Sequence, residues 1–458
     1  GYMKKVRILL LFPIFCMLAS ACNDESDIHE LFPAEFHKIL YIIESGENRM
    51  TIYNTGENVT KTFTVCKAGS NPALTANVHI GVLSQDIVDE EYAVGGGFSY
   101  RIIPQETYKI DATELSFSSS EENKKVNITL FPDQLQQVMD RAEENTQWLL
   151  PLEAVSMTDS INSEKNRYIL YVDDVVVPPV GFKRAGVQVL THDFTTGAFV
   201  TTASFGLLTV DNMWDIDATF AVDKEYVSAY NIEHGTAYQF PSEGTYAIDE
   251  QVSLAANEQD ASVNISISDF QGKKSGYFML PVHATGVSIF EIQESNELYA
   301  LALRLVGKKF DRTDWEVIDF CSEEPTGEGA NGGHAAHVLD GNLSTYWHTM
   351  WSNWPQCACP HHLVIDTKLE REFTQVGVVQ RKNDSWLGDI KNFTVSVSSD
   401  NQIWTEIGSG LGDRNTGEEQ IFDVTPTKGR YLRFDFLDTW RSGESHISVV
   451  ELYAYGVE

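Results

Sequence analysis

Hydrophobic and polar residues alternate in short stretches over most of the chain from about Phe32 onward. Residues 126–130 read Val-Asn-Ile-Thr-Leu, and residues 263–267 read Val-Asn-Ile-Ser-Ile. Alternation with a period of two sends successive side chains to opposite faces of a strand, so each stretch predicts a half-buried β-strand. Clusters of turn-forming residues separate such stretches, which indicates an all-β protein built from short strands.

These two strands belong to an internal repeat. Similar segments occur in the same order in both copies, and the run of short strands and turns predicts an Ig-like β-sandwich for each. The first copy is longer between its second and third segments, where residues 132–144 begin with a proline and predict a short helix. The matching segments are 103–111 with 240–249, 127–129 with 264–266, and 150–152 with 280–282.

The length of 458 residues predicts about three domains. Pro178 and Pro179 end a hydrophobic run and stiffen a linker between the two repeats. We therefore expect two tandem sandwiches followed by a third domain. The predicted segments are a signal peptide at 1–22, a flexible tether at 23–31, sandwiches at 32–174 and 175–308, and the third domain at 309–458.

Acidic residues outnumber basic ones two to one, with 66 Asp and Glu against 33 Lys and Arg, for a formal charge of -33. Such a surface repels phosphate backbones and anionic lipid headgroups. Nucleic acid is therefore excluded as a partner.

The first residues have the pattern of an export signal. Lys4, Lys5 and Arg7 precede an apolar run that is too short to span a bilayer. The run ends in Leu-Ala-Ser-Ala-Cys at 18–22, which resembles a bacterial lipobox and implies a lipid on Cys22. The acidic residues at 23–27 resemble the surface-export signal of Bacteroidetes lipoproteins, which implies the outer membrane and the cell surface. An ordinary secretory signal is the alternative.

The last third carries a series of motifs: DGNLSTYW at 340–347, LVID at 363–366, FTVSVSSDN at 393–401, GRYLRF at 429–434 and VELYAYG at 450–456. In this order they resemble the discoidin-like F5/8 type C domain, and more narrowly carbohydrate-binding module family 32. That resemblance implies a β-jelly roll that binds sugars. The two repeated sandwiches resemble N-terminal domains of unknown function in Bacteroidetes surface lipoproteins.

The resemblance also implies a structural Ca²⁺ ion. Carboxylate, hydroxyl and carbonyl oxygens are the ligands calcium prefers, and six of them fit its usual coordination of about 6–8. A site filled by protein oxygens leaves no place for substrate. The implied ligands are the side chains of Asp340, Thr345 and Glu451 and the carbonyls of His337, Asn342 and Val450.

In galactose-binding relatives a His, an Arg, an Asn and aromatic residues meet on one face built by loops. The Asn is the departure, because Leu-Gly-Asp stands at 387–389 where relatives have Asn-Gly. Asn383 or Asp389 could take its place, so the resemblance leaves open whether the glycan is of the galactose type. The implied sugar-binding residues are His348, Trp351, Arg381 and Trp440, with Asn383 and Trp386 as further candidates.

The cysteines allow several interpretations. Cys357-x-Cys359 with His361 and His362 behind it suggests a metal, but one such pair is a weak signal for zinc. A disulfide from Cys321 to Cys357 or Cys359 and free buried thiols both stay open. Cys66, alone in the first sandwich, is expected to be a buried apolar residue.

No catalytic signature occurs in the sequence: we find no Gly-x-Ser-x-Gly, no His-Glu-x-x-His and no phosphate-binding glycine loop. The three domains leave no stretch of about 200–250 residues for a catalytic barrel. We therefore expect a non-catalytic surface lipoprotein that binds glycan, beside other proteins of a glycan-uptake system. A protein-binding adhesin is one alternative, and a glycoside hydrolase-associated protein with an unrecognised activity in the repeats is the other.

Overall fold

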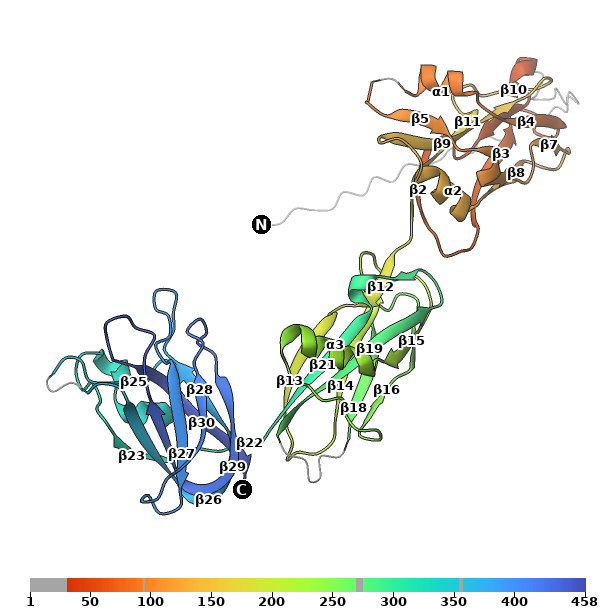
Figure 1. Cartoon of the computed structure of the whole chain (residues 1–458). Helices are drawn as coiled ribbons and strands as arrows, with labels where there is room; N and C mark the ends of the chain where they lie inside the picture. The colour runs from red at the N-terminus through yellow and green to blue at the C-terminus, as the bar shows by residue number, and fades with distance from the viewer. Residues whose placement is uncertain (1–30, 94, 269–274, 354–356) are drawn as a thin grey trace, which may run out of the picture. The chain divides into compact units, whose positions relative to one another are not determined.

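The computed structural model describes residues 31–93, 95–268, 275–353 and 357–458 (Figure 1). Strands dominate them, as predicted, and the chain divides into two compact units, residues 1–177 and 178–458. The predicted signal peptide, the predicted lipidation site Cys22 and nearly all of the predicted tether lie outside the described residues. Among the helices that are described, none has the length and apolar character needed to cross a bilayer.

The first unit is a sandwich of two sheets. Helices α1 (Gln85–Glu91) and α2 (Pro132–Met139) connect strands, and α2 confirms the helix predicted after residue 131. One sheet has the order β10 (Ser160–Ile161), β1 (Ile39–Ile42), β3 (Val59–Ala68), β8 (Asn123–Leu130), β6 (Tyr108–Ile110). The other has the order β2 (Gly46–Tyr53), β11 (Arg167–Val176), β9 (Thr146–Val155), β4 (Ala76–Val82), β7 (Glu114–Phe117), with β5 (Ser99–Ile102) beside β9.

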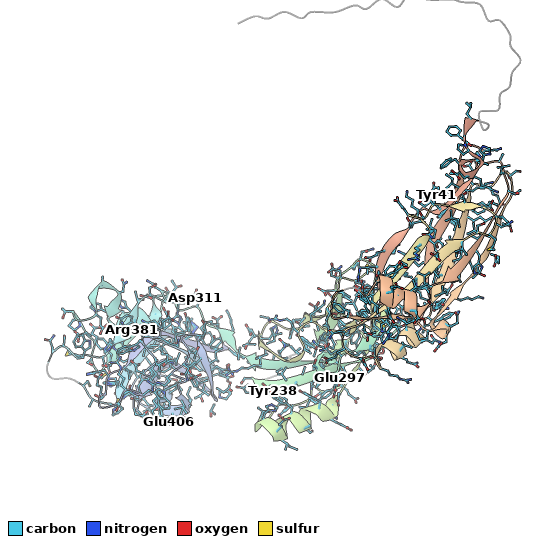
Figure 2. All side chains as sticks on the ribbon, turned by 90° about the horizontal axis from the view of Figure 1, so that it is seen from above. Tyr41, Tyr238, Glu297, Asp311, Arg381 and Glu406 are labelled. Carbon is cyan, nitrogen blue, oxygen red and sulfur yellow. The ribbon has the colours of Figure 1, made fainter. Side chains whose placement is uncertain are left out.

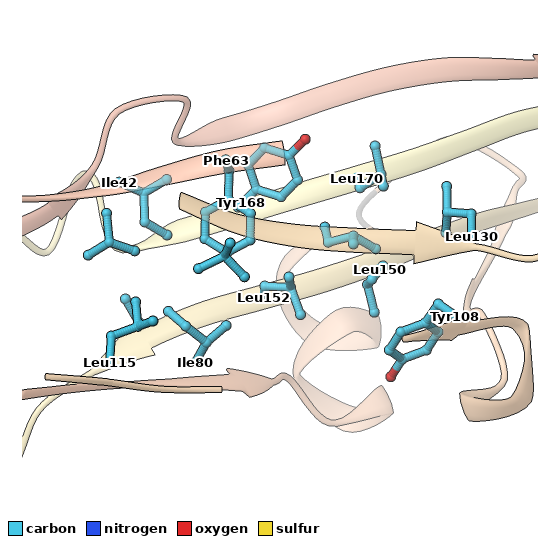
Figure 3. Packing of buried hydrophobic residues seen from close by; sticks show 14 of the residues in the cluster. Ile42, Phe63, Ile80, Tyr108, Leu115, Leu130, Leu150, Leu152, Tyr168 and Leu170 are labelled. Carbon is cyan, nitrogen blue, oxygen red and sulfur yellow. The ribbon is translucent and has the colours of Figure 1, made fainter. Parts of the chain in front are cut away.

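The core of this sandwich lies between the two sheets (Figure 3). Val126, Ile128 and Leu130 of β8 are fully buried, as their alternation predicts. Phe63 and Tyr168 stack across the sheets with their ring centres 4.8 Å apart. Cys66 is buried, as expected. Each large side chain removed from water here contributes roughly 1.5–3 kcal/mol.

The second repeat has the same strand order. Helix α3 (Lys224–His234) takes the connecting position that α1 takes in the first. One sheet has the order β16 (Tyr246–Ile248), β18 (Ala261–Ile267), β14 (Phe199–Leu207), β12 (Pro179–Phe182), β20 (Glu291–Ile292). The other has the order β13 (Gly186–Asp193), β21 (Leu298–Val306), β19 (Gly276–Val287), β15 (Ile216–Val222), β17 (Gln251–Leu254).

One hydrogen-bonded pair recurs in both copies and explains why the repeat is visible in the sequence. The carboxylate of Asp111 accepts from the backbone and side-chain amides of Asn127 at 2.9 and 2.7 Å. Asp249 accepts from Asn264 at the same two distances. In each copy the aspartate directly follows a short strand, β6 or β16. The pair therefore holds β6 against β8 in the first copy and β16 against β18 in the second.

The C-terminal domain is built on one curled sheet, which agrees with the predicted discoidin-like jelly roll. Its β26 runs for 20 residues and bends at two register shifts against β29. The strand order is β24 (Gly332–Gly333), β25 (Tyr346–His348), β30 (Ser448–Val457), β26 (His361–Gln380), β29 (Gln420–Phe436), β27 (Asn392–Ser398), β28 (Thr405–Leu411), with β22 (Lys308–Lys309) beside β30 and β23 (Glu316–Phe320) beside β26.

Two tryptophans of this domain differ in burial. Trp347 is fully buried, and its indole N–H donates to the carbonyl of Ser322 at 2.8 Å. Trp404 is only half-buried, because it lies in the turn before β28 and not within a strand. That turn contains Asn401 in the left-handed conformation, with a φ of 60°, which asparagine tolerates.

Candidate functional site

A cavity of about 400 Å³ opens on the C-terminal domain among the segments that follow β25 and β26 and the loop that precedes β30. Loops carried by a rigid sheet hold their side chains in fixed places, which suits recognition. The cavity is lined by two residues each of four types: Trp351 and Trp386, Arg381 and Arg441, Glu328 and Glu444, His348 and His446.

Four of the six predicted sugar-binding residues line this cavity, namely His348, Trp351, Arg381 (Figure 2) and Trp386. Asn383 and Trp440 are not part of the lining. Asn383 closes a tight turn with Trp386 through two backbone hydrogen bonds of 3.0 and 3.2 Å. The indole N–H of Trp440 donates to the carbonyl of Gly412 at 2.9 Å, which holds the ring against the neighbouring loop.

The two tryptophans of the cavity keep part of their surface in water. Trp351 is 40% exposed and Trp386 is 38% exposed. The guanidinium carbon of Arg441 lies 4.6 Å from the centre of the Trp386 ring, and that of Arg381 lies 5.7 Å from it. Aromatic surface beside charged donors can take a ligand that has one apolar face and hydroxyls around its edge.

Glu328 connects two of the other lining residues, Trp351 and Arg381, with Tyr346, which does not line the cavity. Its carboxylate accepts from the hydroxyl of Tyr346 at 2.6 Å, from the indole N–H of Trp351 at 2.7 Å and from Arg381 at 3.3 Å. Burial disfavours the charged form, but the hydrogen bonds from Tyr346 and Trp351 outweigh it and lower the pKa of Glu328. The carboxylate is therefore ionised at neutral pH and orients both an aromatic and a cationic side chain.

A second network adjoins the first, since His348 Nε2 lies 3.8 Å from Glu328 Oε1. His348 Nδ1 donates to the carbonyl of Thr349 at 2.7 Å, which leaves Nε2 to accept from Arg441 at 3.3 Å. Burial lowers the pKa of His348, so the ring is neutral at pH 7. Asp389 lies behind Arg441: its buried carboxylate accepts from Arg441 Nη2 at 2.6 Å and from the hydroxyl of Ser448 at 2.8 Å. Asp389, a candidate replacement for the missing Asn, therefore supports Arg441.

Beneath the cavity, Glu324 joins two loops. It is fully buried and accepts from the backbone amides of Gly327, Trp351 and Ser352 at 3.0, 2.9 and 2.8 Å, and from the hydroxyl of Ser352. These bonds hold the segment that carries Glu328 next to the segment that carries Trp351. Glu324 is thus a positioning residue for the site.

The residues predicted to hold calcium come together at another place in this domain. In the loop after the short 3-10 helix Ala335–Leu339, Asp340 accepts from the amide of Asn342 at 2.8 Å and from the hydroxyl of Thr345 at 2.7 Å. The carbonyl of His337 accepts from the amide of Asp340 at 3.3 Å. Gly341 has a φ of 73°, which allows the tight turn.

Glu451, next to Val450 on β30, completes this cluster from the other end of the domain. It is fully buried, and its Oε2 accepts from Arg312 at 2.7 Å, while its Oε1 has no partner among the described residues. Burial raises the pKa of Glu451, and the nearby carboxylate of Asp340 raises it further. A buried carboxylate oxygen without a donor, beside a second carboxylate, fits a hard cation.

Four residues of the cavity were not predicted from the sequence: Glu328, Arg441, Glu444 and His446. All four lie in loops, and an acidic residue is an uninformative signal in so acidic a chain. The one available signal was the run Trp-Arg-Ser-Gly-Glu-Ser-His at 440–446, which concentrates recognition side chains in a loop just before the last strand.

Comparison with protein families divides the chain in the same way. A model for the F5/8 type C domain matches residues 320–452. A second model, described as a "-like, N-terminal domain", matches residues 36–161 and 178–291, which together make up just over half of the chain.

Two curated relatives each match about a third of the chain. A galactose oxidase of Gibberella zeae is 27% identical over 182 residues, 38% of this chain and 25% of that protein. A sialidase of Micromonospora viridifaciens is 26% identical over 148 residues, 32% of this chain and 22% of that protein. The chain spans about a quarter of the length of these relatives.

Among solved structures, the C-terminal domain of a chitobiase from Bacteroides fragilis is 28% identical in sequence. The match covers 33% of this chain and 98% of that chain, with a TM-score of 0.30. A family 32 carbohydrate-binding module from C. perfringens, solved in complex with galactose, is 18% identical and covers 33% of this chain and 99% of its own, with a TM-score of 0.27.

Proposed function

The chain belongs to the family of the repeated N-terminal domain and carries an F5/8 type C domain at residues 320–452, and from this premise we propose that it is a non-catalytic glycan-binding protein. The cavity of the C-terminal domain is the binding site. The two sandwiches act as spacers, and a calcium ion held by Asp340 and Glu451 stabilises the C-terminal domain.

The observation that carries this proposal is the composition of the cavity. Two half-exposed tryptophans lie beside two arginines, two carboxylates and two histidines on one loop-built face. An indole face stacks on the C–H face of a pyranose, and planar charged groups bond pairs of hydroxyls. A small concave site with a few convergent polar groups is the usual form of a small-ligand site.

A glycan array followed by titration of the best ligand tests the site. We expect Trp386→Ala to weaken binding about tenfold to a hundredfold, because the lost stacking surface contributes on the order of 1–3 kcal/mol. Arg381→Ala should have an effect of similar size, because it removes charged hydrogen bonds to hydroxyls. Affinity is measured by calorimetry on the purified protein.

The matched control for Trp386→Ala is Leu387→Ala. Leu387 is the next residue of the same loop, is 47% exposed and does not line the cavity. Equal losses in both variants, or unchanged affinity in Trp386→Ala and Arg381→Ala, would place the binding site elsewhere. Capture of a surface protein with no glycan bound on the array would favour the adhesin alternative.

The cellular setting rests on the N-terminal sequence. The lipobox-like segment at 18–22 and the acidic residues after it support a lipid anchor on Cys22 and display on the outer membrane, facing external glycans. Other glycan-uptake proteins are the partners expected at that location.

Replacing Cys22 tests the anchor. All acyl chains of the proposed anchor depend on Cys22, and stable anchoring by lipid takes more than one acyl chain. In the native host, Cys22→Ala should therefore release the protein into the soluble fraction. Cys16→Ala, in the same predicted signal, is the control and should stay with the membranes. A Cys22→Ala protein that remains membrane-bound and is still labelled by a lipid precursor would contradict the anchor.

A further inference from the structure

Two cysteines and a histidine converge on the C-terminal domain outside the cavity and outside the calcium cluster. Cys321 follows β23, Cys357 lies in the segment before β26, and His361 is the first residue of β26. Their Sγ and ring nitrogen atoms all lie within 4.8 Å of one another. Cys321 Sγ is 3.2 Å from His361 Nδ1.

The orientation of His361 is fixed from its other side. Its Nε2 is hydrogen-bonded to the carbonyl oxygen of Ser445. A carbonyl can only accept, so Nε2 carries the hydrogen and Nδ1 presents its lone pair toward Cys321. The ring is fully buried and cannot swing away. Histidines that bind metals almost always donate their other ring N–H in this way, to a backbone carbonyl or a carboxylate, which sets the tautomer.

We propose that Cys321, Cys357 and His361 bind one zinc ion. Thiolate sulfur and imidazole nitrogen are ligands that zinc prefers, at about 2.3 and 2.0–2.1 Å. Such bond lengths place the ligand atoms of a tetrahedral site roughly 3–4 Å apart, so only small shifts would close the site. On binding, both thiols lose their protons to solvent and the neutral imidazole loses none, so the three protein ligands release two protons for each zinc ion.

Three protein ligands leave the fourth position of the zinc ion to water. Cys359 is not part of the trio, and its Sγ lies 3.3 Å from the carbonyl of Ser445. Ser445 is flanked by Glu444 and His446, which line the cavity. Through His361, zinc would therefore anchor the segment that carries Glu444 and His446. Zinc binding can be measured with no glycan present.

The test uses the purified, fully reduced full chain with Zn²⁺ alone as the probe. We expect one bound zinc per chain by elemental analysis, proton release on binding, and protection of two thiols from alkylation. Co²⁺ in place of zinc should give a thiolate-to-metal charge-transfer band. Cu⁺ is titrated separately, because soft thiolates also select it. Binding of Cu⁺ without any binding of Zn²⁺ would overturn the assignment of zinc.

Substitutions of single residues test which side chains bind the zinc ion. Cys357→Ser and His361→Gln should each weaken zinc binding more than about a hundredfold, which exceeds the usual effect of losing an outer-shell partner. Cys66→Ser, in the first sandwich, should leave it unchanged. Thermal unfolding identifies any variant that does not fold. Cys357 is half-buried and His361 is fully buried, so Cys357→Ser should disturb folding less than His361→Gln.

Three further results would overturn the proposal. The first is that the reduced protein takes up no zinc, and the second is that the Cys357→Ser variant binds zinc as well as the unaltered protein does. The third is a Cys321–Cys357 disulfide in the protein isolated from its own compartment, detected as a linked peptide by mass spectrometry.

Discussion

Replacing Glu324 by alanine is expected to destabilise the C-terminal domain by about 3 kcal/mol and to weaken glycan binding at least about tenfold. The carboxylate is fully buried and accepts from four backbone amides, the longest bond being 3.4 Å from Thr326, and from one hydroxyl. Without it these donors lose their acceptor, and each buried unsatisfied donor costs roughly 1–3 kcal/mol. The loops of Glu328 and Trp351 would then separate, so affinity falls although Glu324 does not line the cavity.

The same residue gives a pH dependence. Burial opposes the ionisation of Glu324, but hydrogen bonds from Ser352 and from backbone amides outweigh it and lower its pKa from 4.5 to about 2. The folded state therefore releases this proton more readily than the unfolded state. Its contribution to stability is fully present above pH 4.5 and is lost as the pH falls from 4.5 toward 2. Glu324→Gln should flatten this part of the acid-unfolding curve.

The matched control for Glu324 is Glu316. Its side chain is 64% exposed and forms a surface ion pair with Lys368 at 2.8 Å. Exposed pairs contribute about 0–1 kcal/mol, so Glu316→Ala should unfold almost as the unaltered protein does in denaturant titrations. If Glu324→Ala and Glu316→Ala lose the same stability, Glu324 does not join the loops as described.

The strands of this chain could be predicted well because the alternation of hydrophobic and polar residues is a local pattern. Alternation at 126–130 and 263–267 corresponds to buried residues in β8 and β18. Alternation carries no strand direction, however. It could not predict that β2 runs parallel to β11 in the first copy, or that β13 runs parallel to β21 in the second. Pairing of that kind depends on contacts between residues more than a hundred positions apart.

Part of the site was predictable because it follows the ends of regular strands. His348 ends β25 and Arg381 follows β26, so their places could be counted from strand motifs. Glu328 and Arg441 lie in loops, and their roles depend on Tyr346 and Asp389, which are distant in sequence. Trp440 and Arg441 are neighbours, yet only Arg441 lines the cavity, because loop geometry decides which side chain faces inward.

The cysteines illustrate the same limit. Cys357-x-Cys359 is a recognisable sequence motif, but in the fold Cys357 lies beside Cys321 and His361 instead. Cys321 comes close because β23 lies beside β26 and pairs Phe320 with Leu363. Register between strands, which the sequence does not display, therefore decides the composition of the cluster.

Removing calcium is expected to lower the unfolding temperature of the C-terminal domain by roughly 5 °C or more. Without a cation, the buried Oε1 of Glu451 has no partner among the described residues and faces the carboxylate of Asp340. Bound calcium would satisfy that oxygen and cancel the repulsion. An ion present at about a hundred times its dissociation constant stabilises the folded state by about 2.7 kcal/mol.

The ion also joins two distant parts of the chain. Asp340 lies in the loop before β25, and Glu451 lies on the last strand, β30, so one ion would restrain both ends of the domain. Thermal unfolding is followed after chelation and again after calcium alone is restored, which separates its effect from that of zinc. Asp340→Asn should abolish the shift. Glu406→Gln, at an exposed carboxylate of β28 (Figure 2), should retain it. Equal unfolding temperatures with and without calcium, together with no bound calcium by elemental analysis, would show that Glu451 and Asp340 tolerate each other without an ion.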